Sequence, residues 1–143
     1  MESLKLTRNL WLTEFIPPEI LENYGGNALW FIDQRIINIC QFIRDRFEVP
    51  ITINNWFSGG PYRYSAYRDP ASTVGALLSQ HKAGRAADFR LKGVDSEEIR
   101  QDIINNWPLY QDVGLTTIER GTPTWVHIDC RNTGRETLFI VNP

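Results

Sequence analysis

Both histidines of this 143-residue chain, His81 and His127, lie in short segments that also contain an aspartate. His81 begins the run HKAGRAAD, which ends at Asp88, and His127 lies in TWVHIDCR. A fold that uses these side chains together must bring two distant stretches of chain into contact. Two imidazoles and one carboxylate are typical of a catalytic zinc site, in which three protein ligands leave one coordination position open for water. We therefore expect His81, Asp88 and His127 to converge on one zinc ion.

The segment TWVHIDCR alternates in the manner of a half-buried strand. A period of two places Val126, Ile128 and Cys130 on one face, which we expect to face the core. The opposite face then presents His127 and Asp129 about 7 Å apart along the strand. This pattern predicts that the imidazole lines a cleft.

The segment from His81 to Asp88 is suited to a tight turn. Gly84 permits the turn, and two small alanines follow it, so that both side chains are able to approach one ion. A competing interpretation involves no metal: His81 caps a turn, Asp88 pairs with Arg85 or Arg90, and His127 is a hydrogen-bonded strand residue. Both segments occur in one chain and contain all of its histidines, and this favours the metal site.

Composition limits the classes of partner. The chain is 42% hydrophobic, which suits a single domain over residues 1–143. Fifteen basic against 17 acidic residues give a net charge of -2, so no nucleic-acid partner is expected. The start MESLKLTRNLWLTEF lacks the apolar run of a signal peptide, and no stretch approaches the ~20 apolar residues that span a bilayer. We expect synthesis in the cytoplasm and no membrane partner.

The spacing of apolar residues predicts an α+β domain with a mostly antiparallel sheet flanked by helices. Helices are expected over residues 27–47 and from Asp95 to about Trp107. The aromatic-rich loop 55–78 is expected to be ordered, and its aromatic side chains either form a wall for a ligand or pack onto the core. Trp11, Trp30 and Trp107 are interpreted as core residues. Strands are expected at residues 51–54, 86–91, 113–119, 124–131 and 137–141, with a hairpin turn at RGTP.

The stretch SQHKAGRAAD resembles the SxHxxGxAxD motif of zinc D-Ala-D-Ala carboxypeptidases and related peptidoglycan endopeptidases, the LAS-type metallopeptidases that include phage endolysins. WVHID resembles the second histidine strand of that family, and SAYR (residues 65–68) is similar to its SGYR. The early LTEF segment adds to the likeness. The run NNWFSGG is similar to segments of phage members.

The resemblance implies a Hedgehog/D-Ala-D-Ala peptidase-like fold with His81, Asp88 and His127 as zinc ligands. It also implies that Arg68 holds a carbonyl or carboxylate of the substrate. The activity implied is zinc-dependent hydrolysis of peptidoglycan stem peptides, as a carboxypeptidase or endopeptidase in a phage endolysin. Such a protein acts on the host cell wall after release. The alternative is a phage virion or accessory protein, with other virion proteins as partners, that keeps the metal-binding fold without turnover.

The sequence departs from the family at the catalytic base. Family members place Glu three residues before the second histidine or His two residues before it, where this chain has Thr124 and Trp125. Asp129, on the strand face of His127, and Glu119, across the expected hairpin, are the candidate replacements. Each has a competing structural role, Asp129 as a partner of Arg131 or of a metal ligand, and Glu119 as an exposed strand end. We favour Glu119 as the base and Asp129 as a group that orients His127.

Overall fold

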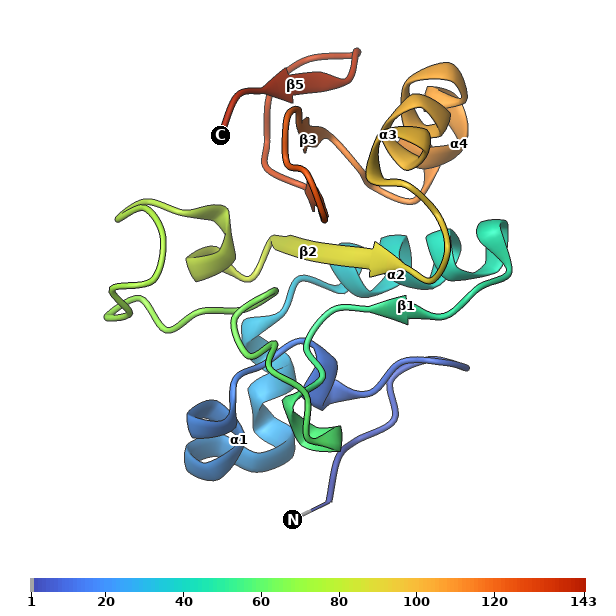
Figure 1. Ribbon diagram of the computed structural model, residues 1–143. Coiled ribbons are helices and arrows are strands. Elements are labelled where there is room, and N and C mark those ends of the chain that lie inside the picture. The colour runs from blue at the N-terminus through green and yellow to red at the C-terminus, as the bar shows by residue number, and fades with distance from the viewer. Residues whose placement is uncertain (1) are drawn as a thin grey trace.

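A computed structural model describes residues 2–143 (Figure 1). The α-helices are α1 (Pro18–Tyr24), α2 (Gln34–Phe47), α3 (Ser96–Asn105) and α4 (Trp107–Asp112). The strands are β1 (Ile51–Thr52), β2 (Ala86–Leu91), β3 (Thr117–Glu119), β4 (Val126–Asp129) and β5 (Phe139–Val141). Short 3-10 helices are η1 (Leu12–Glu14), η2 (Gly25–Phe31), η3 (Trp56–Ser58) and η4 (Gln80–Ala83). Among residues 2–143, no helix combines the length and apolar character needed to cross a bilayer.

Within the described residues, the strands form one sheet in the order β1-β2-β4-β3-β5. The pairs β1–β2, β2–β4 and β3–β4 are antiparallel, whereas β5 joins β3 in parallel. The α+β class is therefore confirmed, but the sheet is mixed and not mostly antiparallel as expected. After β4 the chain reverses and passes to the far edge of β3, so β5 runs against β4 and hence along β3.

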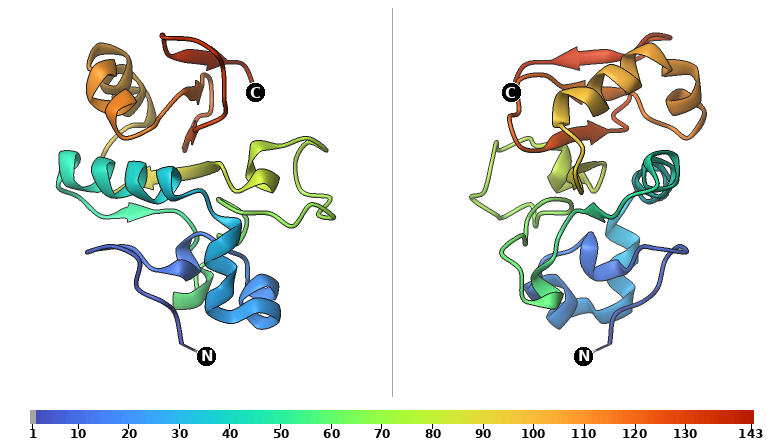
Figure 2. Two further views of the ribbon diagram at one scale, coloured as in Figure 1. Left: turned by 180° about the vertical axis from the view of Figure 1, so that it is seen from behind. Right: turned by 45° about the vertical axis from the view of Figure 1, so that its right-hand side comes forward.

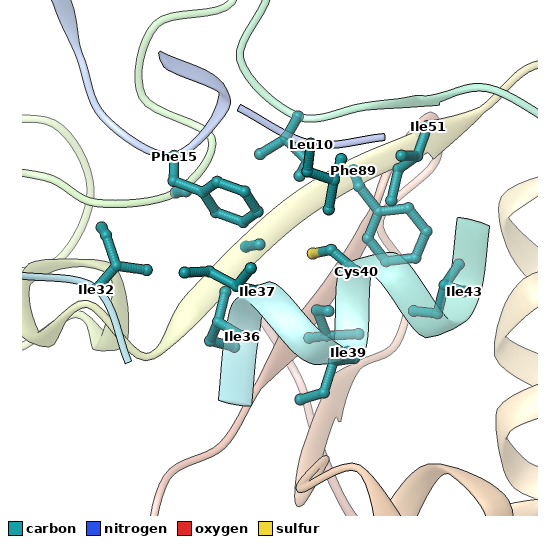
Figure 3. Close-up of a cluster of buried hydrophobic side chains, with 14 of the residues drawn as sticks. Leu10, Phe15, Ile32, Ile36, Ile37, Ile39, Cys40, Ile43, Ile51 and Phe89 are labelled. Atoms are coloured by element: carbon teal, nitrogen blue, oxygen red, sulfur yellow. The ribbon is translucent and has the colours of Figure 1, made fainter. Parts of the chain in front are cut away.

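Helix α2 supplies much of the core and lies along β2 in the ribbon views (Figure 2). Its apolar side chains are buried together with Phe89 of β2 and with Leu10 and Phe15 from the N-terminal segment (Figure 3). Burying each such side chain stabilises the fold by roughly 1.5–3 kcal/mol. The core residues that α2 contributes are Ile36, Ile37, Ile39, Cys40 and Ile43.

The expected helix over residues 27–47 is wrong at its start. Asp33 has an extended backbone, and its carboxylate accepts a hydrogen bond from the Arg35 N–H at 2.9 Å, which caps the helix beginning at Gln34. The preceding Gly25–Phe31 segment is a 3-10 helix, so the apolar stripe runs across a break in the chain. Trp30, expected in the core, is 87% exposed on this segment. Trp11 is 43% exposed, and the Trp107 ring is partly buried against the core.

The long loop between β1 and β2 is held to the rest of the fold by Asn54. This side chain donates to the Ile16 carbonyl at 3.1 Å and accepts from the Ser65 N–H at 2.8 Å. The Tyr67 N–H donates to the Phe15 carbonyl at 2.9 Å. The part of the loop around Ser65 and Tyr67 is thus fixed against the N-terminal segment.

Candidate metal centre

The structure brings His81 of η4, Asp88 of β2 and His127 of β4 together. One potential ligand atom from each lies within 4.8 Å of the other two. Asp88 Oδ1 is 3.3 Å from His81 Nε2 and 2.9 Å from His127 Nδ1. The register of β2 and β4 places Asp88 directly opposite His127. The convergence expected from the sequence is therefore present.

Local hydrogen bonds explain how η4 presents His81. The Ser79 hydroxyl accepts from the His81 N–H at 3.2 Å, and Gly84 ends the turn with a φ of 69°. The chain then enters β2, where the Asp88 N–H donates to the Ser65 carbonyl at 2.6 Å. The turn and the strand thereby present the imidazole and the carboxylate to the same space.

Each imidazole is oriented by a hydrogen bond on the nitrogen that faces away from Asp88. His81 Nδ1 lies 2.9 Å from the Ala66 carbonyl oxygen, and His127 Nε2 lies 2.8 Å from Asp129 Oδ2. Metal-binding histidines characteristically donate their second ring N–H to a carbonyl or carboxylate, which fixes the tautomer. The two nitrogens and one carboxylate oxygen that remain fit a zinc ion with an open coordination position.

The charges of the site are strongly coupled. Burial opposes ionisation of Asp88, but hydrogen bonds with His127 and His81 outweigh it and hold the pKa of Asp88 well below its usual range. Burial also disfavours the charged form of His127, yet hydrogen bonds with Asp129 and Asp88 raise its pKa to about 9. A metal ion that binds His127 would therefore compete with a proton for the same ring.

The two candidate bases occupy different sides of His127. Glu119 Oε1 lies 3.9 Å from His127 Nδ1, the nitrogen that faces Asp88, and the Glu119 side chain is 23% exposed. Asp129 is fully buried, and Arg131 Nε and Nη2 donate to its carboxylate at 2.8 and 2.5 Å. Asp129 contacts the opposite nitrogen of His127. Glu119 is thus on the side of His127 that faces Asp88, and Asp129 is engaged with the opposite nitrogen and with Arg131.

Arg68 lies at the edge of the site. Its Nη2 is 3.7 Å from Asp88 Oδ2, and its Nε donates to the Tyr64 carbonyl at 2.8 Å. Burial lowers the pKa of the Arg68 guanidinium, against the influence of the Asp88 and Glu119 charges. One hydrogen bond and one ion pair therefore hold the arginine beside the proposed metal ligands.

The interpretation without a metal paired Asp88 with Arg85 or Arg90. Within residues 2–143, the ion pairs of Asp88 are with His81, His127 and Arg68, and neither Arg85 nor Arg90 takes part.

Two cavities differ in their relation to this site. One, of about 700 Å³, is lined by residues such as Trp11, Glu14 and Phe57 and contains none of the three candidate ligands. A smaller cleft of about 280 Å³ adjoins Asp88. Of these two cavities, only the smaller one reaches a candidate ligand. Sequence reasoning missed Arg90 as a lining residue of this cleft, although its position two residues after Asp88 on one strand was the available signal.

The fold and the site agree with one comparison to known proteins. A protein-family model described as Peptidase M15 matches residues 15–129, a range that contains His81, Asp88, His127, Arg68 and Glu119. Comparisons with curated proteins and with solved structures give no match.

Proposed function

Because the chain belongs to the peptidase M15 family, we propose that it is a zinc-dependent enzyme that hydrolyses peptide bonds in bacterial peptidoglycan. One observation carries the proposal: His81, Asp88 and His127 converge within 4.8 Å, and both imidazoles have their remote nitrogens hydrogen-bonded. The stem peptides of peptidoglycan are the substrate implied by the SxHxxGxAxD-like motif. The biological role that we favour is that of a phage endolysin acting on the host cell wall.

His81 Nε2, Asp88 Oδ1 and His127 Nδ1 would hold the zinc ion. When bound, zinc supplies Lewis acidity, which polarises a carbonyl group and lowers the pKa of a coordinated water toward ~7. Three protein ligands leave room for that water and for the substrate.

The chain's own residues supply the remaining steps. Glu119 accepts the proton of the attacking water at its carboxylate and passes it to the leaving amine, since it lies on the metal side of His127. Arg68 holds the carbonyl oxygen as negative charge develops on it. Asp129 keeps the His127 ring in the orientation that presents Nδ1 to the metal.

A second candidate function is a phage virion or accessory protein that keeps the site without turnover. Thr124 and Trp125 favour it, because they occupy the positions where the family places its base. The two functions differ in whether Glu119 is able to replace that base.

Incubation of the zinc-loaded protein with purified peptidoglycan separates the two functions. We expect new amino termini in the digest by mass spectrometry, loss of this activity with a chelator, and its recovery when zinc is restored. Cleavage that survives complete removal of metal would exclude the proposed mechanism. A fully zinc-loaded protein that cuts no stem peptide would support the structural role.

A further inference from the structure

The cleft beside Asp88 contains an arginine that the mechanism above does not use. Arg90 follows Asp88 by two residues in β2, so both side chains project from the same face of the sheet. The Arg90 guanidinium carbon lies 3.9 Å from the centroid of the Tyr62 ring. This stacking fixes the plane of the guanidinium in the wall of the cleft.

One nitrogen of this guanidinium, Nη1, is buried and has no hydrogen-bond partner among residues 2–143. No ion pair of Arg90 is found in the same residues. Arg100 shows the usual arrangement of a buried arginine, because its guanidinium donates to Glu97 and to the hydroxyl and carbonyl of Thr122. No carboxylate within residues 2–143 therefore compensates the charge of Arg90, and an anionic ligand in the cleft would supply the missing counter-charge.

The charge of the cleft indicates the chemistry of such a ligand. Its lining residues include Arg63, Arg68 and Arg90, together with Asp88. Asp88 is already engaged by His81 and His127. The cleft therefore has an excess of positive charge, and a planar guanidinium is best matched by a carboxylate.

We propose that Arg90, stacked on Tyr62, forms a subsite for a free carboxylate of the substrate. Side chains two residues apart on a strand are about 7 Å apart, so this carboxylate lies within one or two residues of the scissile bond. That the ligand is a peptide rests on the proposed function. The carboxylate comes from the C-terminus or from an acidic side chain of the peptide.

Binding of one short acetylated peptide in four forms tests the subsite. The peptide has a C-terminal and a side-chain carboxylate, and the forms carry both free, either one amidated, or both amidated. By calorimetry with the zinc-loaded protein, we expect the doubly amidated form to bind about 10- to 100-fold more weakly than the best acidic form. The single amidation that causes the loss identifies which carboxylate is bound.

Three variants make the test specific to Arg90. Arg90→Gln should abolish the preference for the acidic forms, and Arg90→Lys should keep part of it because the charge remains. Arg135→Gln is the matched control, since Arg135 also stacks on an aromatic ring, Phe139 at 4.2 Å, but does not line the cleft. A purely structural role of Arg90 would lower the melting temperature of Arg90→Gln without changing the ratio of acid to amide affinities.

The possible results distinguish a failure of the subsite from a failure of the proposed function. Cleavage of peptidoglycan combined with equal binding of all four forms, or with no binding of any form, overturns the subsite and leaves the peptidase. A preference for acid that Arg90→Gln removes, in a protein that cuts no peptidoglycan, supports the subsite and overturns the peptidase. An unchanged preference in Arg90→Gln assigns the carboxylate to another residue and overturns the proposal.

Discussion

Replacing Glu119 with glutamine is expected to lower kcat by about 10²- to 10⁴-fold while the protein still binds one zinc ion, because this is the typical contribution of a general base. Glutamine keeps the size of the side chain but is unable to accept a proton usefully. The Glu119 carboxylate lies 3.9 Å from the metal-facing nitrogen of His127. Steady-state hydrolysis of a stem peptide, with zinc content measured on the same samples, tests the assignment.

Asp129→Asn is the matched control for this result. Asp129 is fully buried and contacts Nε2 of His127, the ring nitrogen that faces away from Asp88. Its replacement should therefore affect the binding of zinc. We expect zinc affinity to fall about 10- to 100-fold, with most of the turnover recovered at saturating zinc. Near-normal turnover in Glu119→Gln would mean that another group is the base. If excess zinc does not restore the turnover lost in Asp129→Asn, Asp129 becomes the stronger candidate for the general base.

Gly84→Ala is expected to destabilise the fold by about 3 kcal/mol or more. Gly84 has a φ of 69°, a conformation that costs an L-residue roughly 1–2 kcal/mol. A Cβ atom at this position would also lie 1.8 Å from the Phe31 carbonyl oxygen, so the backbone of η2 or η4 must move. Thermal unfolding followed by circular dichroism should show a melting temperature lower by about 10 °C.

Gly93→Ala isolates the conformational part of this effect. Gly93 has a similar φ of 74°, but a Cβ atom there would meet nothing within 4 Å. We expect a loss of only about 1 kcal/mol. Equal destabilisation by the two substitutions would contradict the close approach of η4 to Phe31, and with it the placement of His81 described above.

The candidate metal ligands could be predicted because the strands that hold them are set by local sequence patterns. The alternation in TWVHIDCR correctly predicted that Val126, Ile128 and Cys130 are buried, but the expected half-buried strand is wrong, because His127 and Asp129 on the opposite face of β4 are buried as well. The predicted strand at residues 86–91 is confirmed as β2, which presents Asp88. A periodic pattern of this kind is set by residues that are close together along the chain, so it is visible in a single sequence.

Other features depend on contacts between distant residues, and a single sequence does not contain them. The start of α2 is an exception, because Asp33 caps the helix through the N–H of Arg35 two residues away, and the apolar stripe of residues 27–47 hid this local signal. The parallel pairing of β5 depends on the path of residues 130–138 past β3. Sequence spacing also left Glu119 and Asp129 as alternatives, because both were expected near His127. Their difference lies in which ring nitrogen each carboxylate faces.

Zinc titration of the metal-stripped protein, compared with His81→Ala, tests the central claim most directly. We predict that the unaltered chain binds one zinc ion and that the variant loses this site, because His81 Nε2 is one of three nearby ligand atoms. The fold should survive the substitution, which circular dichroism checks on the same samples. An unaltered chain that takes up no zinc, or a folded His81→Ala variant that still binds one zinc with unchanged affinity, would contradict the account.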